Sequence, residues 1–273
     1  IVRDLRVPRT GLGILVGAAL GAAGALMQGA TRNALAEPGI LGINAGAAFA
    51  VVVAIDVFGI RDVMGYAVCA LLGAGGTAVA VLVLGATGRG AGAVSLALAG
   101  AVVSFLLLSL TSAVLVFDAQ TFDDFRRWVV GTIAGRDADV ALAVAPVIAA
   151  GLVIAFASGR ALNALALGDE VARALGQHVA RARIVATIGF VLLAGGAVAA
   201  AGPIAFVGLA VPHVARAFTG PDYRWVIPYS VVLGAVLLLA FDVLGRIVAR
   251  PADLGVGIVA GLLGAPLFIW LVR

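Results

Sequence analysis

The chain has 273 residues, of which 63% are hydrophobic and only 12% are charged, and its formal net charge is +4. Soluble domains carry about 25% charged residues, so this composition indicates an integral membrane protein. All eighteen basic residues are arginine. Because the Walker A motif needs a lysine to bind phosphate, we expect no ATPase site in this chain. The arginines are spread over many loops, which argues against a nucleic-acid partner.

Apolar segments of membrane-spanning length follow one another along the chain. A bilayer core about 30 Å thick needs roughly 20 apolar residues per helix. The sequence therefore predicts an all-α integral membrane protein, a polytopic helical bundle of about nine spans in a single domain of residues 1–273. The predicted spans are Thr10–Ala30, Ile40–Phe58, Asp62–Ala86, Ala93–Phe117, Val140–Ala157, Ile184–Ala201, the half-span Pro203–His213, Val226–Val248 and Gly255–Val272.

Small residues and prolines predict where helices approach closely or break. Gly17, Gly21 and Gly24 form a small-residue face that favours close helix packing. The second span begins with three polar or flexible residues, which predicts a broken start; these are Gly42, Asn44 and Gly46. Prolines beside or within later spans predict breaks or kinks; these are Pro203, Pro212 and Pro266.

Residues 118–139 form an amphipathic segment that is too short and too charged to span a membrane. Its apolar side chains are Phe122, Phe125, Trp128, Val129 and Ile133. The pattern predicts a helix lying at a membrane interface.

The longest polar stretch, Arg160–Arg183, keeps apolar residues at helical spacing between its charges. It predicts two short helices, punctuated by Gly168 and Gly176, with Asp169 capping the second. The apolar stripe comprises Leu162, Leu165, Leu167, Val171, Ala172, Leu175 and Val179. Because short isolated helices are marginal in water, we interpret this stripe as a docking surface for a soluble protein. An ordinary solvated loop helix fits the spacing equally well.

Arginine asymmetry between the two sides does not give the orientation. Alternating sides along the spans puts nine arginines on each. One side has Arg32, Arg89, Arg160, Arg173, Arg181, Arg183, Arg216, Arg224 and Arg273, and the other has Arg3, Arg6, Arg9, Arg61, Arg126, Arg127, Arg136, Arg246 and Arg250.

Few residues suggest site chemistry within the apolar spans. The lone Cys69 has no partner for a disulfide, and no residue stands at metal-ligand spacing from His213, so we expect no metal site. We expect His213 at a polar helix end. Gln28, Asn44 and Asp242 must face protein or a water path, because a charge in lipid costs roughly 2.5–3.5 kcal/mol on insertion scales.

Four segments together resemble the FecCD-type permeases of ABC importers, which take up ferric siderophores, haem and cobalamin. They are residues 6–47, 163–176, 202–228 and 255–271. The resemblance implies ten helices per subunit in the bacterial cytoplasmic (inner) membrane. It also implies a second permease subunit, identical or homologous, a cytoplasmic ABC ATPase dimer and an extracytoplasmic substrate-binding protein. In the family a first helix precedes the segment that starts at Arg6, so that helix is not expected within these 273 residues.

By this resemblance, Arg160–Arg183 matches the family's cytoplasmic coupling loop. Five of its residues would sit in the cleft of the ATPase; these are Asp169, Glu170, Arg173, Leu175 and Gly176. ATP and magnesium would bind to that partner, and this chain would hold no cofactor. The resemblance also sets the orientation, with the polar stretch inside the cell.

The same resemblance implies docking and gate residues. Arg6, Arg9 and Arg246 match basic positions on the outer rim where the binding protein docks, although each could instead snorkel at a span end, and Arg246 could pair with Asp242 four residues earlier. The residues that match the inner constriction are Asn33, Leu35 and Leu98. Ordinary helix packing explains Leu98 equally well. Ala34 and Gly255 replace prolines that the family favours, which weakens the inference about the gate.

Three functions are conceivable for a polytopic membrane protein with these features. The first is the permease subunit of an importer driven by separate ATPase subunits. The second is a secondary transporter or channel, which would need intramembrane acids as an ion relay, yet only Asp56 and Asp242 lie in spans, each near an end. The third is a scaffold without transport, which the broken helices argue against.

Overall fold

The computed structural model describes residues 6–86, 93–136, 138–249 and 253–272. Every regular element in these ranges is a helix. The elements are α1 (Val7–Thr31), the 3-10 turn η2 (Pro38–Leu41), α2 (Ile43–Asp56), α3 (Val63–Ala86), α4 (Ala93–Phe117), α5 (Ala119–Val129), α6 (Ala138–Ala166), α7 (Asp169–Ala174), α8 (Val179–Ala201), α9 (Val207–Thr219), α10 (Tyr223–Val248) and α11 (Val256–Val272). Among the described residues, six helices are long and apolar enough to cross a membrane: α1, α3, α4, α6, α8 and α10. The chain is a polytopic helical membrane protein.

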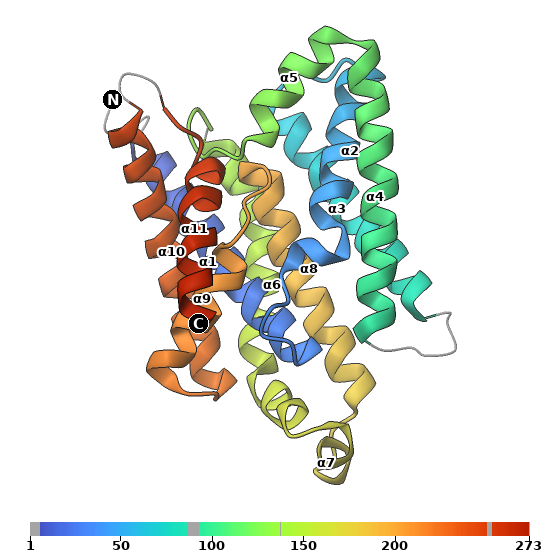
Figure 1. Ribbon diagram of the computed structural model, residues 1–273, viewed down its shortest axis with the longest axis vertical. Helices are drawn as coiled ribbons and strands as arrows, with labels where there is room; N and C mark the ends of the chain where they lie inside the picture. The colour runs from blue at the N-terminus through green and yellow to red at the C-terminus, as the bar shows by residue number, and fades with distance from the viewer. Residues whose placement is uncertain (1–5, 87–92, 137, 250–252, 273) are drawn as a thin grey trace.

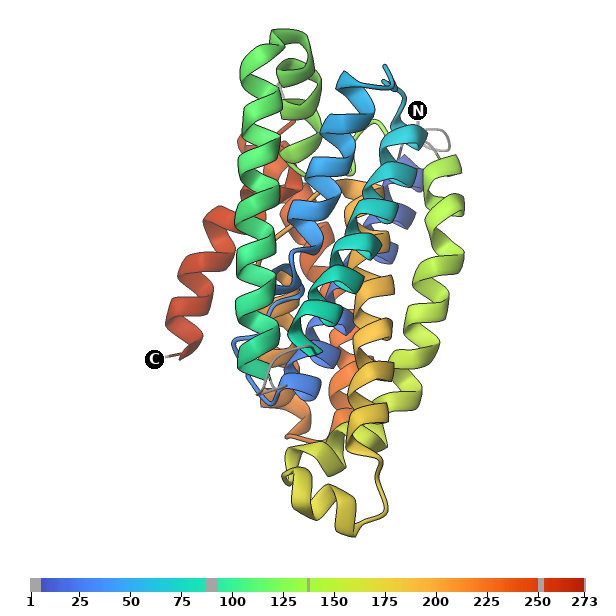
Figure 2. The ribbon, with the colours of Figure 1, turned by 90° about the vertical axis from the view of Figure 1, so that its right-hand side faces the viewer.

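The helices run between two ends of an elongated bundle (Figures 1 and 2). The short helix α5 lies across one end and the short helix α7 lies at the other, so these are named the α5 end and the α7 end. Helix α1 begins at the α5 end and ends at the α7 end (Figure 1). Of the arginines in the alternating assignment, Arg3, Arg89, Arg250 and Arg273 lie outside the described residues.

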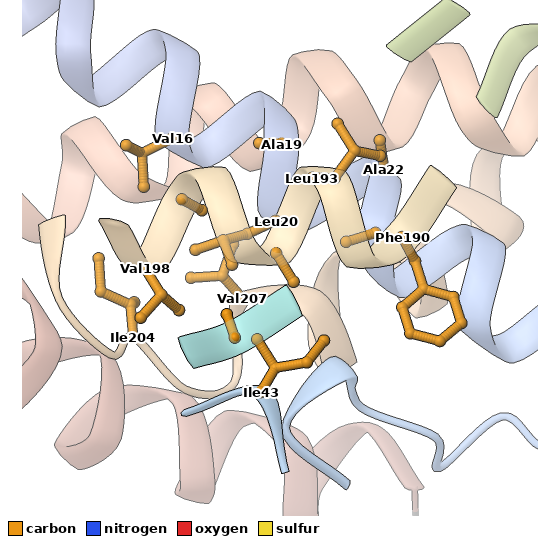
Figure 3. Packing of buried hydrophobic residues seen from close by; sticks show 14 of the residues in the cluster. Val16, Ala19, Leu20, Ala22, Ile43, Phe190, Leu193, Val198, Ile204 and Val207 are labelled. Carbon is orange, nitrogen blue, oxygen red and sulfur yellow. The ribbon is translucent and has the colours of Figure 1, made fainter. Parts of the chain in front are cut away.

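Helix α1 lies at the centre of the bundle, where its many small residues allow close contacts: twelve of its 25 residues are alanine or glycine. It packs against α6, α8, α9 and α10, and Figure 3 shows its Val16, Ala19 and Leu20 beside residues of α8. A Cβ on Gly17 would lie 2.4 Å from the carbonyl oxygen of Gly234. The small-residue face predicted from the sequence is therefore confirmed as a site of close helix contact.

The predicted breaks in the second and seventh spans are present, although some bounds differ. The second span is split into η2 and α2 by Gly42, which has a φ of +73°. The half-span was predicted at Pro203–His213, but α9 runs from Val207 to Thr219, so the expectation of His213 at a helix end was wrong. Pro212 lies inside α9 and has no backbone N–H, so the carbonyl of Gly208 receives no helical hydrogen bond from it. The Gln28 amide nitrogen lies 3.5 Å from that oxygen and 3.2 Å from the Leu209 oxygen.

The amphipathic segment folds as α5 and packs on α2 and α4. The Asp118 side chain caps it by accepting a hydrogen bond from the backbone N–H of Gln120 at 2.9 Å. Phe125 and Trp128 are buried beneath it, whereas Phe122 and Val129 stay exposed. The predicted apolar side is thus divided between the bundle and its surroundings.

Candidate functional site

The polar stretch Arg160–Arg183 contains one short helix rather than two. Helix α6 continues to Ala166 instead of ending at Ala157, and it absorbs the first predicted short helix. The chain then turns at Gly168, forms α7, and turns again at Gly176 before α8 begins. Both glycines have positive φ, +104° and +79°, a backbone region that other residues rarely adopt.

The predicted apolar stripe is split between the bundle and the surface. Four of its residues are buried against the bundle; these are Leu162, Leu165, Ala172 and Val179. Three remain exposed around α7; these are Leu167, Val171 and Leu175. Part of the stripe therefore packs within the chain itself. The exposed part, Leu167, Val171 and Leu175, is called the α7 patch.

Asp169 joins α7 to two other helices instead of capping its own. The N-cap position is Gly168, and no side chain caps α7, so the predicted cap was wrong. The Oδ1 of Asp169 lies 2.9 Å from Arg183 of α8 and 3.0 Å from Arg32, the C-cap residue of α1. Two attractive cations draw the carboxylate away from its own helix end. Glu170, Arg173, Leu175 and Gly176 are exposed.

A second shared carboxylate lies at the α5 end. Asp242 of α10 is 3% exposed and pairs with Arg9 of α1 at 2.7 Å and with Arg246 at 3.1 Å. Arg9 also reaches Asp253 at 2.8 Å. The alternative for Arg246, pairing with Asp242 on one helix face, is present. Arg9 and Arg246 are thus held internally, while Arg6 is exposed.

Two of the predicted gate residues, Asn33 and Leu35, lie close in the chain to Arg32 of the Asp169 cluster. Asn33 follows Arg32 directly, and its side-chain oxygen accepts a hydrogen bond from the Leu35 N–H at 2.9 Å. Leu35 is 54% exposed and Leu98, near the start of α4, is 65% exposed. Turn η2, which follows this segment, packs on α4. Leu98 is therefore not buried in ordinary packing within this chain.

A further link was not visible in the sequence. The Glu37 carboxylate accepts a hydrogen bond of 3.0 Å from the backbone N–H of Phe206. Phe206 has a φ of +67°, a strained backbone for a bulky residue, just before α9 begins. The segment that carries Asn33 and Leu35 is thereby tied to the helix break before α9.

The model of the FecCD transport family matches residues 1–273. The chain belongs to this family. It is 42% identical over 278 residues to the ferric enterobactin transport system permease protein FepD of Escherichia coli, covering 100% of this chain and 82% of that one. It is also 42% identical over 275 residues to the iron(3+)-hydroxamate import system permease protein FhuB of Bacillus subtilis, covering 100% of this chain and 71% of that one.

A solved structure supports the same family at the level of the fold. It is assigned to the metal-chelate type of ABC transporter, in an inward-facing conformation. It matches this chain with a TM-score of 0.91 at 28% identity, covering 100% of this chain and 87% of that one. Members of the FecCD family that resemble this chain are thus membrane permeases of transport systems, which fits an apolar bundle with polar clusters at its two ends.

Proposed function

We propose that the chain is the permease subunit of an ATP-binding-cassette importer that carries a ferric siderophore across the bacterial inner membrane, with haem and cobalamin as the next candidates. The cargo proposal follows the relatives, which are named for ferric enterobactin and iron(3+)-hydroxamate. The chain performs no bond chemistry. It offers its pathway alternately to the two sides of the membrane, and separate ATPase subunits, which hold ATP and magnesium, determine which side is open.

The observation that carries this proposal is the arrangement at the α7 end. Exposed Leu167, Val171 and Leu175 supply an apolar surface for the ATPase cleft. Asp169, the first residue of α7, is ion-paired to Arg32, the residue that follows α1. When the ATPase subunits move α7, the Asp169–Arg32 pair passes the movement to α1 and to the gate segment that starts at Asn33. On this proposal the α7 end is cytoplasmic.

The α5 end would receive the extracytoplasmic substrate-binding protein. Arg6 is exposed and free to meet an acidic residue of that protein. Arg9 and Arg246 are ion-paired with Asp242, so they would contribute mainly by guiding the approach of the binding protein. A second permease subunit would cover part of α4, whose large apolar side chains are mostly exposed; these include Val102, Phe105, Leu106, Val116 and Phe117.

The alternative of an ion-gradient-driven transporter has weaker support. Such a transporter needs intramembrane acids that take up and release an ion. Asp242 is held by two arginines, and Asp56 is exposed at the last turn of α2. Neither aspartate is therefore placed to pass an ion across the membrane.

The proposal is tested by co-purifying the chain with its co-expressed ATP-hydrolysing subunit. Placing a carboxylate in the α7 patch with Leu175→Asp should abolish the complex, because a charge replaces an apolar contact that is 62% exposed in the free chain. The matched control is Phe122→Asp, the same change at a 46% exposed residue of α5. Co-purification that survives Leu175→Asp, or is lost equally in both variants, would contradict docking at α7.

A further inference from the structure

A hollow at the α5 end lies apart from the Asp242 cluster. It has a volume of about 250 Å³ and lies between the first turn of α3, helix α5 and the segment that follows α5. Its polar lining includes Arg61, Tyr66, Asp124, Arg127, Trp128 and Arg136. Since one water takes about 30 Å³ of liquid volume, the hollow has room for a small solute.

The lining carries more positive than negative charge. Asp124 pairs with Arg127 and lies 3.5 Å from Arg61. Arg136 makes no ion pair with any residue that the structure describes. Three guanidinium groups therefore face one carboxylate, and the charge of Arg136 is uncompensated.

Two buried hydrogen-bond donors in this lining have no acceptor. The Nε1 of Trp128, a residue only 2% exposed, and the Nε of Arg136 are both buried without a hydrogen-bond partner. Both groups can only donate. The Oδ2 of Asp124 is also buried without a hydrogen-bond partner, and it lies 3.5 Å from the Nε of Arg61. Buried donors are nearly always satisfied in native proteins, because an unpaired donor has lost its hydrogen bonds to water without gaining any in return. Burial also lowers the pKa of Arg136, as expected for a cation removed from water without an opposite charge beside it.

One kind of ligand satisfies the donors and the charge together. A water molecule could accept both hydrogen bonds but would leave Arg136 without an opposite charge. A carboxylate or phosphate presents several acceptor oxygens with negative charge, and it matches the fork of a guanidinium. We propose that this hollow is an oxyanion site, in which Arg136 and Trp128 donate directly to a carboxylate or phosphate group. That group is supplied by a small dissolved anion or by the head of an anionic lipid. The site depends neither on the ATPase partner nor on the cargo.

Trp128 is itself the reporter for the test. In a Trp225→Phe, Trp270→Phe background it is the sole tryptophan, because the chain contains three. The full chain is placed in phosphatidylcholine nanodiscs and titrated with inorganic phosphate or citrate, with sodium chloride at matched ionic strength as the control. We expect a saturable change in Trp128 emission with the oxyanions and none with chloride.

Two variants separate a specific site from general charge. Arg136→Gln should raise the half-saturating concentration about 10- to 100-fold, because it removes a charge-assisted donor. Arg126→Gln is the matched control, since Arg126 is 65% exposed and lies outside the hollow's lining, and it should leave the titration unchanged. Thermal unfolding provides a second readout. Phosphate should raise the Tm of the parent and of Arg126→Gln, but not that of Arg136→Gln.

The lipid arm identifies the source of the anion. In nanodiscs containing phosphatidylglycerol, a head group in the site would give the bound emission before any phosphate is added and would shift the phosphate titration to higher concentration. An unshifted titration would identify the dissolved anion as the ligand. The proposal is overturned if Trp128 emission responds to no oxyanion in zwitterionic discs and not to phosphatidylglycerol either. It is also overturned if Arg136→Gln behaves like Arg126→Gln.

Discussion

The two ends of α1 are held in the same way but in different surroundings. At the α5 end Arg9 shares Asp242 with Arg246, and at the α7 end Arg32 shares Asp169 with Arg183. Asp242 is 3% exposed, whereas Asp169 is 26% exposed. Ion pairs near water are weak and screened by salt, while breaking a buried pair leaves an uncompensated charge. We therefore expect α1 to be held more firmly at the α5 end than at the α7 end.

This difference fits the roles proposed for the two ends. A central helix that is fixed at one end and releasable at the other can swing when α7 is moved. The tight contacts of α1 with α10, such as Gly17 against Gly234, keep those two helices together during such a movement. The α7 end then becomes the place where small perturbations alter coupling with little loss of stability.

The largest effect should come from removing the buried carboxylate. Asp242→Ala removes the buried carboxylate between Arg9 and Arg246, so that Arg9, which is 17% exposed, keeps only the exposed Asp253 as a partner. We expect the free energy of unfolding to fall by about 3–5 kcal/mol. Asp253→Asn, which removes a 47% exposed partner of the same arginine, should cost less than about 1 kcal/mol. If the two variants lose the same free energy of unfolding in a denaturant titration, burial does not strengthen the ion pairs of Asp242.

A smaller effect is expected from the turn that ends α7. Gly176 has a φ of +79°, and a Cβ placed there would meet no atom within 4 Å. Gly176→Ala should therefore lower stability by about 1–2 kcal/mol through backbone strain alone. Gly176→Asn should cost less, because asparagine tolerates this conformation better. If both variants unfold like the parent, the turn is not strained.

The exposed ion pairs of Asp169 should be weaker than the buried ion pairs of Asp242, and they should be sensitive to salt. Asp169→Asn should cost no more than about 1 kcal/mol for each lost pair in low salt, and the difference from the parent should shrink in 0.5 M sodium chloride. The buried cluster gives the contrast, since the loss from Asp242→Ala should persist at both salt concentrations. A salt-independent loss at Asp169 would show that the two ends do not differ.

The smallest effect concerns acid stability at the α7 end. The Arg224 guanidinium and the Asn163 amide hold the pKa of Asp222 below its usual range. A lowered carboxylate pKa contributes stability that is present above the unfolded value near 4 and is lost as the pH falls below it. Asp222→Asn should therefore flatten the decline in Tm between about pH 5 and pH 3. An unchanged decline would assign the acid sensitivity to other groups.

Much of the fold follows from the sequence because it depends on local pattern. The length of apolar runs gives α4 at its observed bounds, and Gly42 marks the break in the second span. The end of α6 was missed because the apolar run stops at Ala157, so the polar residues that follow were assigned to a separate short helix, whereas α6 continues without a break to Ala166. Periodicity alone does not show where a helix leaves the membrane.

The candidate site was only partly predictable, because its contacts join residues far apart in the chain. Asp242 and Arg246, four residues apart, can be paired from spacing alone. The pairs Arg9–Asp242 and Arg32–Asp169, and the hydrogen bond from Phe206 to Glu37, depend on how helices pack in three dimensions. The sequence also gave no sign that part of the apolar stripe is buried within the chain. The roles of the residues named for coupling, docking and the gate stay predictions.

ATP-driven transport through this chain can be measured as uptake of a ferric siderophore into proteoliposomes that hold the chain, its ATP-hydrolysing subunits and the binding protein. We expect accumulation that requires ATP and is lost in Leu175→Asp, while Phe122→Asp transports like the parent. Accumulation that proceeds without nucleotide under a proton or sodium gradient, and that is unchanged by Leu175→Asp, would contradict this expectation.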